Sequence, residues 1–251
     1  MKTGFLGILG GMGPLATADF LRKLAKKTPA EVDQAHIPVL LYGDCTTPDR
    51  TANLVAGGAS PLPKLLDGIR FLNQHRVQAI CVPCNSAHAW FEQMQAASDA
   101  PLLHIVRASA AQVRRKYPAA SCVGVLSTVG TYRMGLYSRT LQDLGYRVVT
   151  PTEAEFETLV SPAIAMNKAN RWAEAGAYYD RATQQLLDRG AEIIILGCTE
   201  IPFCMEQQVR LHPTVFVDSN DALVDAAIEC FMPASTATTA QAGTALRITT
   251  R

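Results

Sequence analysis

Short runs of consecutive apolar residues alternate with longer segments of helical periodicity along almost the whole chain. The apolar runs predict strands at residues 4–9, 37–42, 79–83, 102–106, 122–126, 147–150, 192–196 and 214–217. The segments between them predict helices, for example at residues 63–74, 132–144, 171–188 and 221–231. Continuous apolar strands that are separated by helices are typical of parallel sheets covered on both faces. The pattern therefore predicts an α/β fold.

The chain also repeats itself. The segment GILGGMGP from Gly7 aligns with GVLSTVGT from Gly124, an offset of 117 positions. The segments AICVPCNSA and IIILGCTEI align through Cys84 and Cys198, an offset of 114 positions. Two strand-and-loop units that recur at nearly the same offset indicate two similar three-layer halves. Because ligands of open α/β sheets bind beyond the carboxyl ends of the strands, two facing halves would place the two thiols on opposite walls of one cleft.

The repeat and the strand pattern suggest a division into two domains. We assign residues 1–105 and 214–231 to the first α/β domain and residues 106–213 to the second. Residues 232–251 are rich in small polar side chains and have no hydrophobic period. We expect this last stretch to be a disordered tail without a role in the chemistry.

Composition narrows the classes of function. The chain has 251 residues, of which 48% are hydrophobic and 18% charged, and a net charge of +1, so neither a nucleic-acid partner nor a membrane is expected. The lysine and apolar residues at the N-terminus superficially suggest a signal peptide. Glycines interrupt this stretch in the pattern of a strand followed by a turn, so we expect a cytoplasmic protein. Seven cysteines, without regular spacing, predict reduced thiols rather than disulfides.

Cys84 follows a predicted buried strand that ends at Pro83. A helix is expected to begin directly afterwards, with Asn85 or Ser86 as its N-cap. The positive end of that helix would lower the pKa of the thiol toward neutrality. A single buried cysteine, however, is more often a small hydrophobic residue than a reactive group.

Cys198 repeats this arrangement after the apolar run EIIILG. Thr199 is the corresponding cap, and Glu200 adds a carboxylate beside the thiol. Chance placement of two buried cysteines does not readily explain why both occupy equivalent positions of a repeat. They predict paired thiol chemistry.

The spacing Cys81-x-x-Cys84 also raises the alternatives of a zinc site and a redox pair. Positions three apart in a strand point to opposite faces, so Cys81 is expected in the core while Cys84 emerges at the strand end. His88 could be a metal ligand, but the chain has no second Cys-x-x-Cys, and Cys198 and Cys204 have the wrong spacing. We expect no metal, and a lining or supporting role for His88.

A glycine-rich turn, Gly11-x-Gly13-x-x-Ala16, follows the first predicted strand. It resembles the fingerprint of dinucleotide-binding proteins, but such turns also bind carboxylates through backbone N–H groups. The acidic residue of the fingerprint is expected about 20 residues on, whereas Asp44 lies 31 positions after Gly13. We therefore favour a carboxylate-binding turn and include Met12 and Gly13 among the substrate-binding residues.

Further polar residues follow the strands of both halves. Arg50 lies on a predicted loop beyond the second strand, where its guanidinium suits a carboxylate, although a solvated loop arginine is an equally good local interpretation. Lys168 lies between two helical segments, where most lysines are surface charges. The hydroxyls of Thr128 and Thr131 could bond to a bound carboxylate.

Four segments together resemble the aspartate/glutamate racemase family: GGMGP at 10–14, PDR at 48–50, PCNSAH at 83–88 and GCTEI at 197–201. They occur in the order of the family and span nearly the whole chain short of the tail. The resemblance implies two α/β domains related by pseudo-twofold symmetry, an active site between them, no cofactor, and commonly a homodimer. It also implies that Cys84 and Cys198 are the two catalytic acid/base residues.

The resemblance also implies which residues hold the substrate. The family's substrate-binding positions match Arg50, Lys168, Asn85, Ser86 and Ala87. We add as further substrate contacts Thr128, Thr199 and Glu200. In the aspartate racemase branch, Arg50 and Lys168 would hold the two carboxylates of a dicarboxylic amino acid. The chain departs from the family at Ser86, where threonine is common, and keeps the hydroxyl.

The expected function is the interconversion of L and D amino acids, most often aspartate or glutamate, by a two-base mechanism. One thiolate would remove the Cα proton while the opposite thiol delivers a proton to the other face. Two alternatives stay open. One is a related isomerase, such as a maleate isomerase or a hydantoin racemase. The other is a catalytically idle amino-acid-binding or regulatory protein on the same scaffold.

Overall fold

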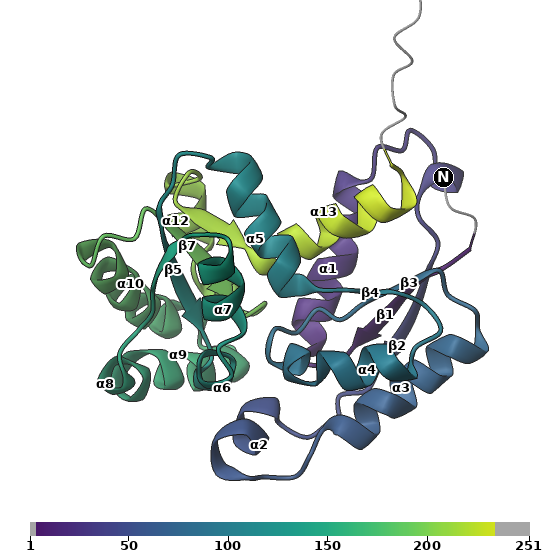
Figure 1. Cartoon of the computed structure of the whole chain (residues 1–251), viewed down its shortest axis with the longest axis horizontal. Coiled ribbons are helices and arrows are strands. Elements are labelled where there is room, and N and C mark those ends of the chain that lie inside the picture. The colour runs from purple at the N-terminus through teal and green to yellow at the C-terminus, as the bar shows by residue number, and fades with distance from the viewer. Residues whose placement is uncertain (1–3, 234–251) are drawn as a thin grey trace, which may run out of the picture.

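The computed structural model describes residues 4–233, which form two four-stranded parallel sheets (Figure 1). The first sheet has the order β2-β1-β3-β4, with strands Val39–Gly43, Leu6–Gly10, Ala79–Cys81 and Leu102–Leu103. The second has the order β6-β5-β7-β8, with strands Arg147–Val149, Cys122–Ser127, Ile193–Gly197 and Phe216–Asp218. Each strand thus has a counterpart in the other half, and the predicted α/β class and repeat are confirmed.

The similarity of the halves extends to the packing of single residues. A Cβ atom on Gly7 of β1 would lie within 3.3 Å of side chains of Leu72, Val77 and Ile80. A Cβ atom on Gly124 of β5 would lie within 3.5 Å of Leu186, Ala191 and Ile194. The corresponding contact residues are each 114 positions apart, as the cysteines are. Each half therefore uses a glycine at the same place of its central strand to bring a helix close to the sheet.

Helices cover both faces of the first sheet (Figure 1). One face packs against α3 (Leu62–Gln74) and α4 (Phe91–Ala97), and it includes Leu9 and Ile80. The other face, with Leu6 and Ile8, packs against helices α1 (Pro14–Lys27), α5 (Ile105–Lys116) and α13 (Ser219–Phe231). Successive side chains of a strand point to opposite faces, so a strand that is apolar at every position contributes to both layers.

The second sheet is covered in the same way. Leu126 and Ile194 pack with α9 (Ser161–Lys168) and α10 (Trp172–Asp188) on one face. The other face, with Val125 and Ile195, packs with α5 and α7 (Leu136–Asp143). The remaining helical elements are η1 (Asp33–Ala35), α2 (Arg50–Ala56), η2 (Ser86–Trp90), α6 (Val129–Arg133), α8 (Glu153–Glu155), η3 (Phe156–Val160), α11 (Ile201–Cys204) and α12 (Glu206–Leu211).

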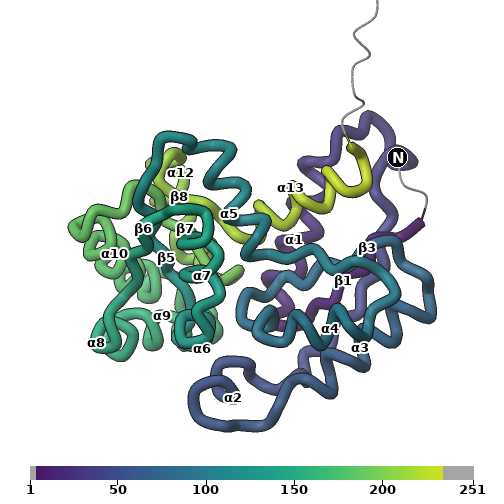
Figure 2. The backbone as a smooth tube through the Cα atoms, viewed as in Figure 1, coloured from purple at the N-terminus to yellow at the C-terminus, as the bar shows by residue number. Residues whose placement is uncertain are grey.

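The two halves are joined along α5 and α13, which lie between them in Figure 1. A single hydrophobic cluster includes Ile8 of β1 and Ile195 of β7 together with Val106 of α5 and Leu223 of α13. On another side, α2 reaches from the first half to contact α6 of the second (Figure 2). The two halves are thus in contact both through a shared core and through α2.

Most predicted elements are confirmed with ends that shift by one or two residues, and three larger differences from the predictions follow. The segment 132–144 is two helices, α6 and α7, because Gly135 takes a left-handed conformation with a φ of 62° between them. The predicted strand 102–106 ends after Leu103, since the His104 side chain accepts a hydrogen bond from the N–H of Val106 (3.2 Å) and caps α5.

The third difference concerns the proposed domain boundary at residue 214. β8 pairs in parallel with β7, through Ile194 and Phe216 among others, so this strand belongs to the second sheet rather than to the first domain. The assignment of 216–218 is therefore wrong, and the division into domains otherwise stays a prediction. The expected tail lies outside the described residues from position 234 onward. No helix within residues 4–233 is long and apolar enough to cross a membrane.

Candidate active site

The carboxyl ends of the central strands of both sheets converge on a narrow cleft with a cavity volume of about 30 Å³. Ten of the twelve expected site residues line it: Met12, Arg50, Cys84, Asn85, Ser86, Thr128, Lys168, Cys198, Thr199 and Glu200. Gly13 borders it, since a Cβ there would lie 2.8 Å from Oε1 of Glu200. Ala87 is buried in the core behind the cleft.

Three lining residues were not expected from the sequence: Asp49, Thr51 and Ile164. Asp49 lies inside the PDR segment at 48–50, so the sequence carries a signal for it. Thr51 follows in the first turn of α2, and Ile164 comes from α9 of the other half. These residues show that α2 and α9 face each other across the cleft.

Cys84 lies three residues beyond the end of β3 and is almost fully buried. Its backbone N–H donates to the carbonyl of Val82 (2.7 Å), which tightens the chain as it leaves the sheet. Cys81 is fully buried on the opposite face, as predicted. The predicted helix cap at Asn85 or Ser86 is wrong, because the Asn85 side chain makes no cap bond and Ser86 lies inside a short 3₁₀ turn that precedes α4.

Cys198 follows β7 directly and is equally buried. Burial, and then the negative charge of Glu200, raise the pKa of its thiol to about 12, against a weaker opposing hydrogen bond from the Glu200 backbone. The prediction that a helix N-terminus lowers the thiol pKa is therefore wrong for Cys198. The helix that follows, α11, has only four residues, and removal of the thiolate from water is the larger effect.

Thr199 links the two cysteine loops. Its hydroxyl donates to the backbone carbonyl of Pro83 (3.2 Å), the residue before Cys84. The predicted cap role of Thr199 is thereby replaced by a contact between the halves. Because Thr199 follows Cys198 and Pro83 precedes Cys84, this bond fixes the two cysteine-bearing loops relative to one another.

Three hydroxyls form a buried cluster, two members of which, Ser86 and Thr128, line the cleft. The Oγ of Ser86 lies 3.0 Å from Oγ1 of Thr128 and 2.9 Å from Oγ1 of Thr131, which are 3.1 Å apart. Thr128 also caps α6 by accepting from the N–H of Thr131 (3.2 Å). Hydroxyls can turn to donate to a bound carboxylate. The structure thus brings the expected residues Ser86 and Thr128 together from opposite halves.

The side chain of Asn85 is held from behind the cleft. Its amide donates to Oγ of Ser219 (2.9 Å), and its carbonyl accepts from the hydroxyl of Tyr137 (2.6 Å). Ser219 in turn donates to the carbonyl of Leu196 in β7 (2.8 Å). Both ends of the Asn85 amide are therefore used to fix the loop that carries Cys84.

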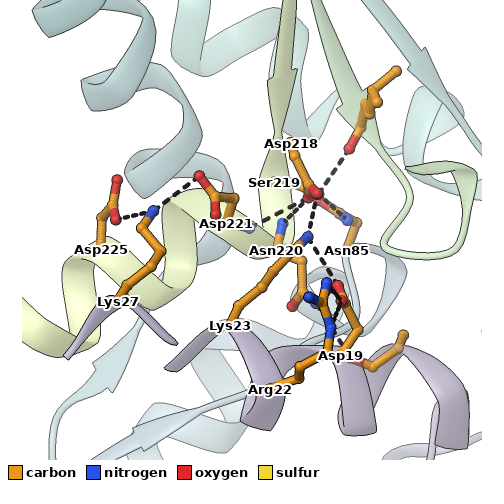
Figure 3. A network of polar contacts seen from close by, with 12 residues as sticks. Asp19, Arg22, Lys23, Lys27, Asn85, Asp218, Ser219, Asn220, Asp221 and Asp225 are labelled. Carbon is orange, nitrogen blue, oxygen red and sulfur yellow. Dashed lines mark hydrogen bonds and ion pairs between the residues drawn. The ribbon is translucent and has the colours of Figure 1, made fainter. Parts of the chain in front are cut away.

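Figure 3 shows that this anchor continues into a charged network at the start of α13. Asp218, next to Ser219, forms an ion pair with Lys23 of α1. Lys23 also contacts Oδ2 of Asp19 (2.8 Å), which accepts a hydrogen bond from the side-chain amide of Asn220 as well (3.1 Å). The other oxygen of Asp19, Oδ1, is bonded by Arg22 (2.6 Å). The loop after Cys84 is thus tied to two helices that pack against the first sheet.

Arg50, Lys168 and Asp49 occupy the more open rim. The ammonium of Lys168 contacts Oδ2 of Asp49 at 2.7 Å, across the cleft. Arg50 donates through Nη1 to the carbonyls of Thr47 (3.2 Å) and Pro48 (3.0 Å). Its Nε is buried without a partner among the described residues. Arg50 therefore keeps hydrogen-bonding capacity for a ligand.

Glu200 is the half-buried acid of the cleft. Burial raises the pKa of its carboxyl group, against the charges of Lys168 and Arg50. Its backbone carbonyl accepts from the side chain of Asn167 (2.6 Å), which fixes the residue in place.

His88 supports the Cys84 loop. Its Nδ1 lies 2.9 Å from the carbonyl of Cys84, and its Nε2 accepts from the N–H of Ile105 (3.2 Å) at the start of α5. These partners require a neutral ring with the proton on Nδ1. Burial lowers the pKa of His88 to about 4, consistent with that state. Within the described part of the chain, no group of three or more His, Cys, Asp or Glu side chains is placed so that it could hold a metal ion.

Residues 9–227 match the family model described as Asp/Glu/Hydantoin racemase. The chain belongs to this family. The family and the enzyme class expected from the sequence, a racemase, are thereby confirmed.

Individual relatives show how far the similarity extends. The aspartate racemase of Picrophilus torridus superposes with a TM-score of 0.79 at 29% identity, covering 90% of this chain and 93% of that one. The broad specificity amino-acid racemase RacX of Bacillus subtilis is 26% identical over 90% of this chain and 98% of its own. A glutamate racemase of Helicobacter pylori is 26% identical over 64% of this chain and 65% of its own.

Proposed function

We propose that this racemase interconverts the enantiomers of an α-amino acid without a cofactor, with Cys84 and Cys198 as its two acid/base groups. The observation that carries the proposal is the equivalent placement of the two thiols. Each follows the third strand of its half, β3 or β7, and both line one cleft. A planar carbanion held between them would be reached by one thiol on each face.

Removal of the Cα proton leaves negative charge that spreads onto the α-carboxylate. Groups that donate to that carboxylate therefore stabilise the transition state. The cluster of Ser86, Thr128 and Thr131 and the unused Nε of Arg50 supply such donors. The bond from Thr199 to Pro83 keeps the two thiols at a fixed separation during the transfer.

The surroundings of Cys198 set its protonation state before substrate binds. The high pKa of Cys198 keeps it as a neutral thiol that can deliver a proton. A thiolate at Cys84 would then remove the Cα proton from the opposite face. The reverse reaction exchanges the roles, so Cys198 has to become a thiolate once per cycle of interconversion.

The preferred substrate in this proposal is an acidic amino acid. Arg50 and Lys168 are the two cations of the cleft lining, and relatives include an aspartate racemase and glutamate racemases. A broader range of side chains is the second candidate, because Asp49 already neutralises Lys168 and RacX is named for broad specificity. The expectations of a homodimer and of a cytoplasmic location stay predictions.

Incubation of the protein with each enantiomer in D₂O tests the proposal. Proton NMR should show loss of the Cα proton signal for aspartate or glutamate, with deuterium mainly in the product of opposite hand. Cys84→Ser and Cys198→Ser should each abolish racemisation, whereas Cys45→Ser, at an exposed thiol, should not. Full racemisation by either of the first two variants would rule out the two-base mechanism.

A further inference from the structure

The charged side chains that line the cleft are not equivalent. Two are cations, Arg50 and Lys168, and two are acids, Asp49 and Glu200. Both oxygens of Asp49 are occupied, because Oδ2 contacts Lys168 (2.7 Å) and Oδ1 accepts from the N–H of Ala52 (2.8 Å). Asp49 is therefore satisfied by the protein itself.

The carboxylate of Glu200 is in a different situation. Among residues 4–233 it makes neither a hydrogen bond nor an ion pair, although burial has removed much of its water. It also rests against the glycine-rich turn, with Oε1 2.8 Å from where a Cβ of Gly13 would lie. A half-buried carboxylate without a partner is costly unless a cation or a donor approaches it.

The place of Glu200 shows which group of a substrate could approach. It is two residues beyond Cys198, close enough for its charge to act on that thiol. The Cα of a substrate has to lie between Cys198 and Cys84 for proton transfer. A substituent on Cα is therefore near Glu200, and the cationic substituent of an amino acid is its ammonium group.

We infer that Glu200 binds the α-ammonium group of the substrate and thereby selects free α-amino acids over the corresponding carboxylic acids. This inference rests on the proposed racemase function and assigns one part of its substrate. Arg50, Lys168 and the hydroxyl cluster are then left for the carboxylates. In this assignment, different side chains of the cleft bind the two opposite charges around Cα.

The assignment also explains how Cys198 can reach its thiolate form. The negative charge of Glu200 is one of the causes that raise the Cys198 pKa. An ammonium group beside Glu200 offsets that charge, so substrate binding eases deprotonation of Cys198. Ligands without an ammonium group would leave the thiol in its resting state.

Matched ligand pairs and a Glu200→Gln variant provide the test. Calorimetry measures the dissociation constants of L-aspartate and succinate, L-glutamate and glutarate, and L-alanine and propionate. For pairs that bind, we expect the wild type to prefer the amino acid by roughly tenfold or more, as for a charge-assisted hydrogen bond. Glu200→Gln should abolish the preference, whereas Glu206→Gln, an exposed change of equal charge, should keep it.

Each outcome decides between the inference and the function on which it rests. An unchanged preference in a folded Glu200→Gln variant overturns the inference, even if Cα exchange continues. Preference without exchange of any amino acid overturns the racemase proposal but supports the ammonium assignment. No binding of any amino acid overturns both. If Glu200→Gln does not fold, Glu200→Asp takes its place, and it should keep a reduced preference because it keeps the charge.

Discussion

Asp49 and Lys168 come from opposite halves of the molecule and meet in a 2.7 Å ion pair at the rim of the cleft. Both side chains are close to half exposed, so the pair contributes little to stability. Its importance lies in competition, since a dicarboxylic substrate that uses Lys168 has to displace Asp49. The charge of Lys168 is therefore already offset by Asp49 before a substrate binds.

Replacing Asp49 with Asn removes this competitor while an amide can still cap α2. We expect the KM for aspartate or glutamate to fall roughly twofold to fivefold, the range of an exposed ion pair. The KM for an uncharged side chain should stay the same. Steady-state kinetics measure both values. Glu174→Gln, which breaks the exposed pair with Arg171, is the matched control. A rise in KM would instead mean that Asp49 itself binds substrate.

Thr199→Val removes the hydroxyl that joins the two cysteine loops and leaves the carbonyl of Pro83 without this donor. We expect a loss of about 1–3 kcal/mol in the free energy of unfolding, the usual cost of an unsatisfied buried group. Racemisation should slow as well, because the separation of the thiols is no longer fixed. Thr140→Val breaks a hydroxyl bond inside α7 (3.0 Å) and should lower stability without the same effect on rate. Equal rates in the two variants would contradict the positioning role.

The alkaline limit of activity should reflect Cys198. A two-base reaction needs one thiol and one thiolate, and the pKa of about 12 keeps the Cys198 proton in place at high pH. We expect kcat/KM to persist into alkaline solution, equally for both enantiomers because their equilibrium constant is one. Glu200→Gln removes a negative charge, lowers that pKa and moves the alkaline decline to lower pH. The ratio of the two profiles cancels ionisation of the substrate. A shift to higher pH would refute the electrostatic explanation.

His88 makes stability depend on pH. Its pKa falls from 6.5 to about 4 on folding. Between these two pH values, His88 is therefore protonated in the unfolded chain but neutral in the folded chain. The contribution of neutral His88 is complete above pH 6.5 and is lost as the pH falls toward 4. Urea unfolding across this range should show a shallower dependence for His88→Gln than for the wild type. His75→Gln is the control, since exposed His75 makes a similar contact with the carbonyl of Phe71 (2.8 Å). Identical slopes for wild type and His88→Gln would exclude this origin.

Structural features that depend on a local sequence pattern, such as strands and the repeat of the two cysteines, could be predicted from the sequence. The strands that carry Cys84 and Cys198 are continuous apolar runs, and their offset of 114 positions marks equivalent places of a repeat. The position of Cys81 in the core followed from strand geometry alone. These features need only a short window of residues and the rule that parallel strands end at one edge of a sheet.

Contacts between distant segments left no such pattern. The partners of Asn85 include Ser219, 134 positions away, and Lys168 lies 119 positions from Asp49. The local sequence predicts Asn85 or Ser86 as a helix cap. In the structure, the side chain of Asn85 instead forms hydrogen bonds with Ser219 and Tyr137. The placement of β8 also escaped prediction, because a short apolar run does not show which of two sheets it joins.

The core shared along α5 and α13 affects how the chain folds during synthesis. α13 follows all eight strands of the described chain, yet its residues pack with β1 of the first sheet and β7 of the second. Neither half can complete its apolar layer while α13 is still inside the ribosome. The two halves therefore share a topology but do not fold as independent units. Both cores are completed only when α13 packs against them.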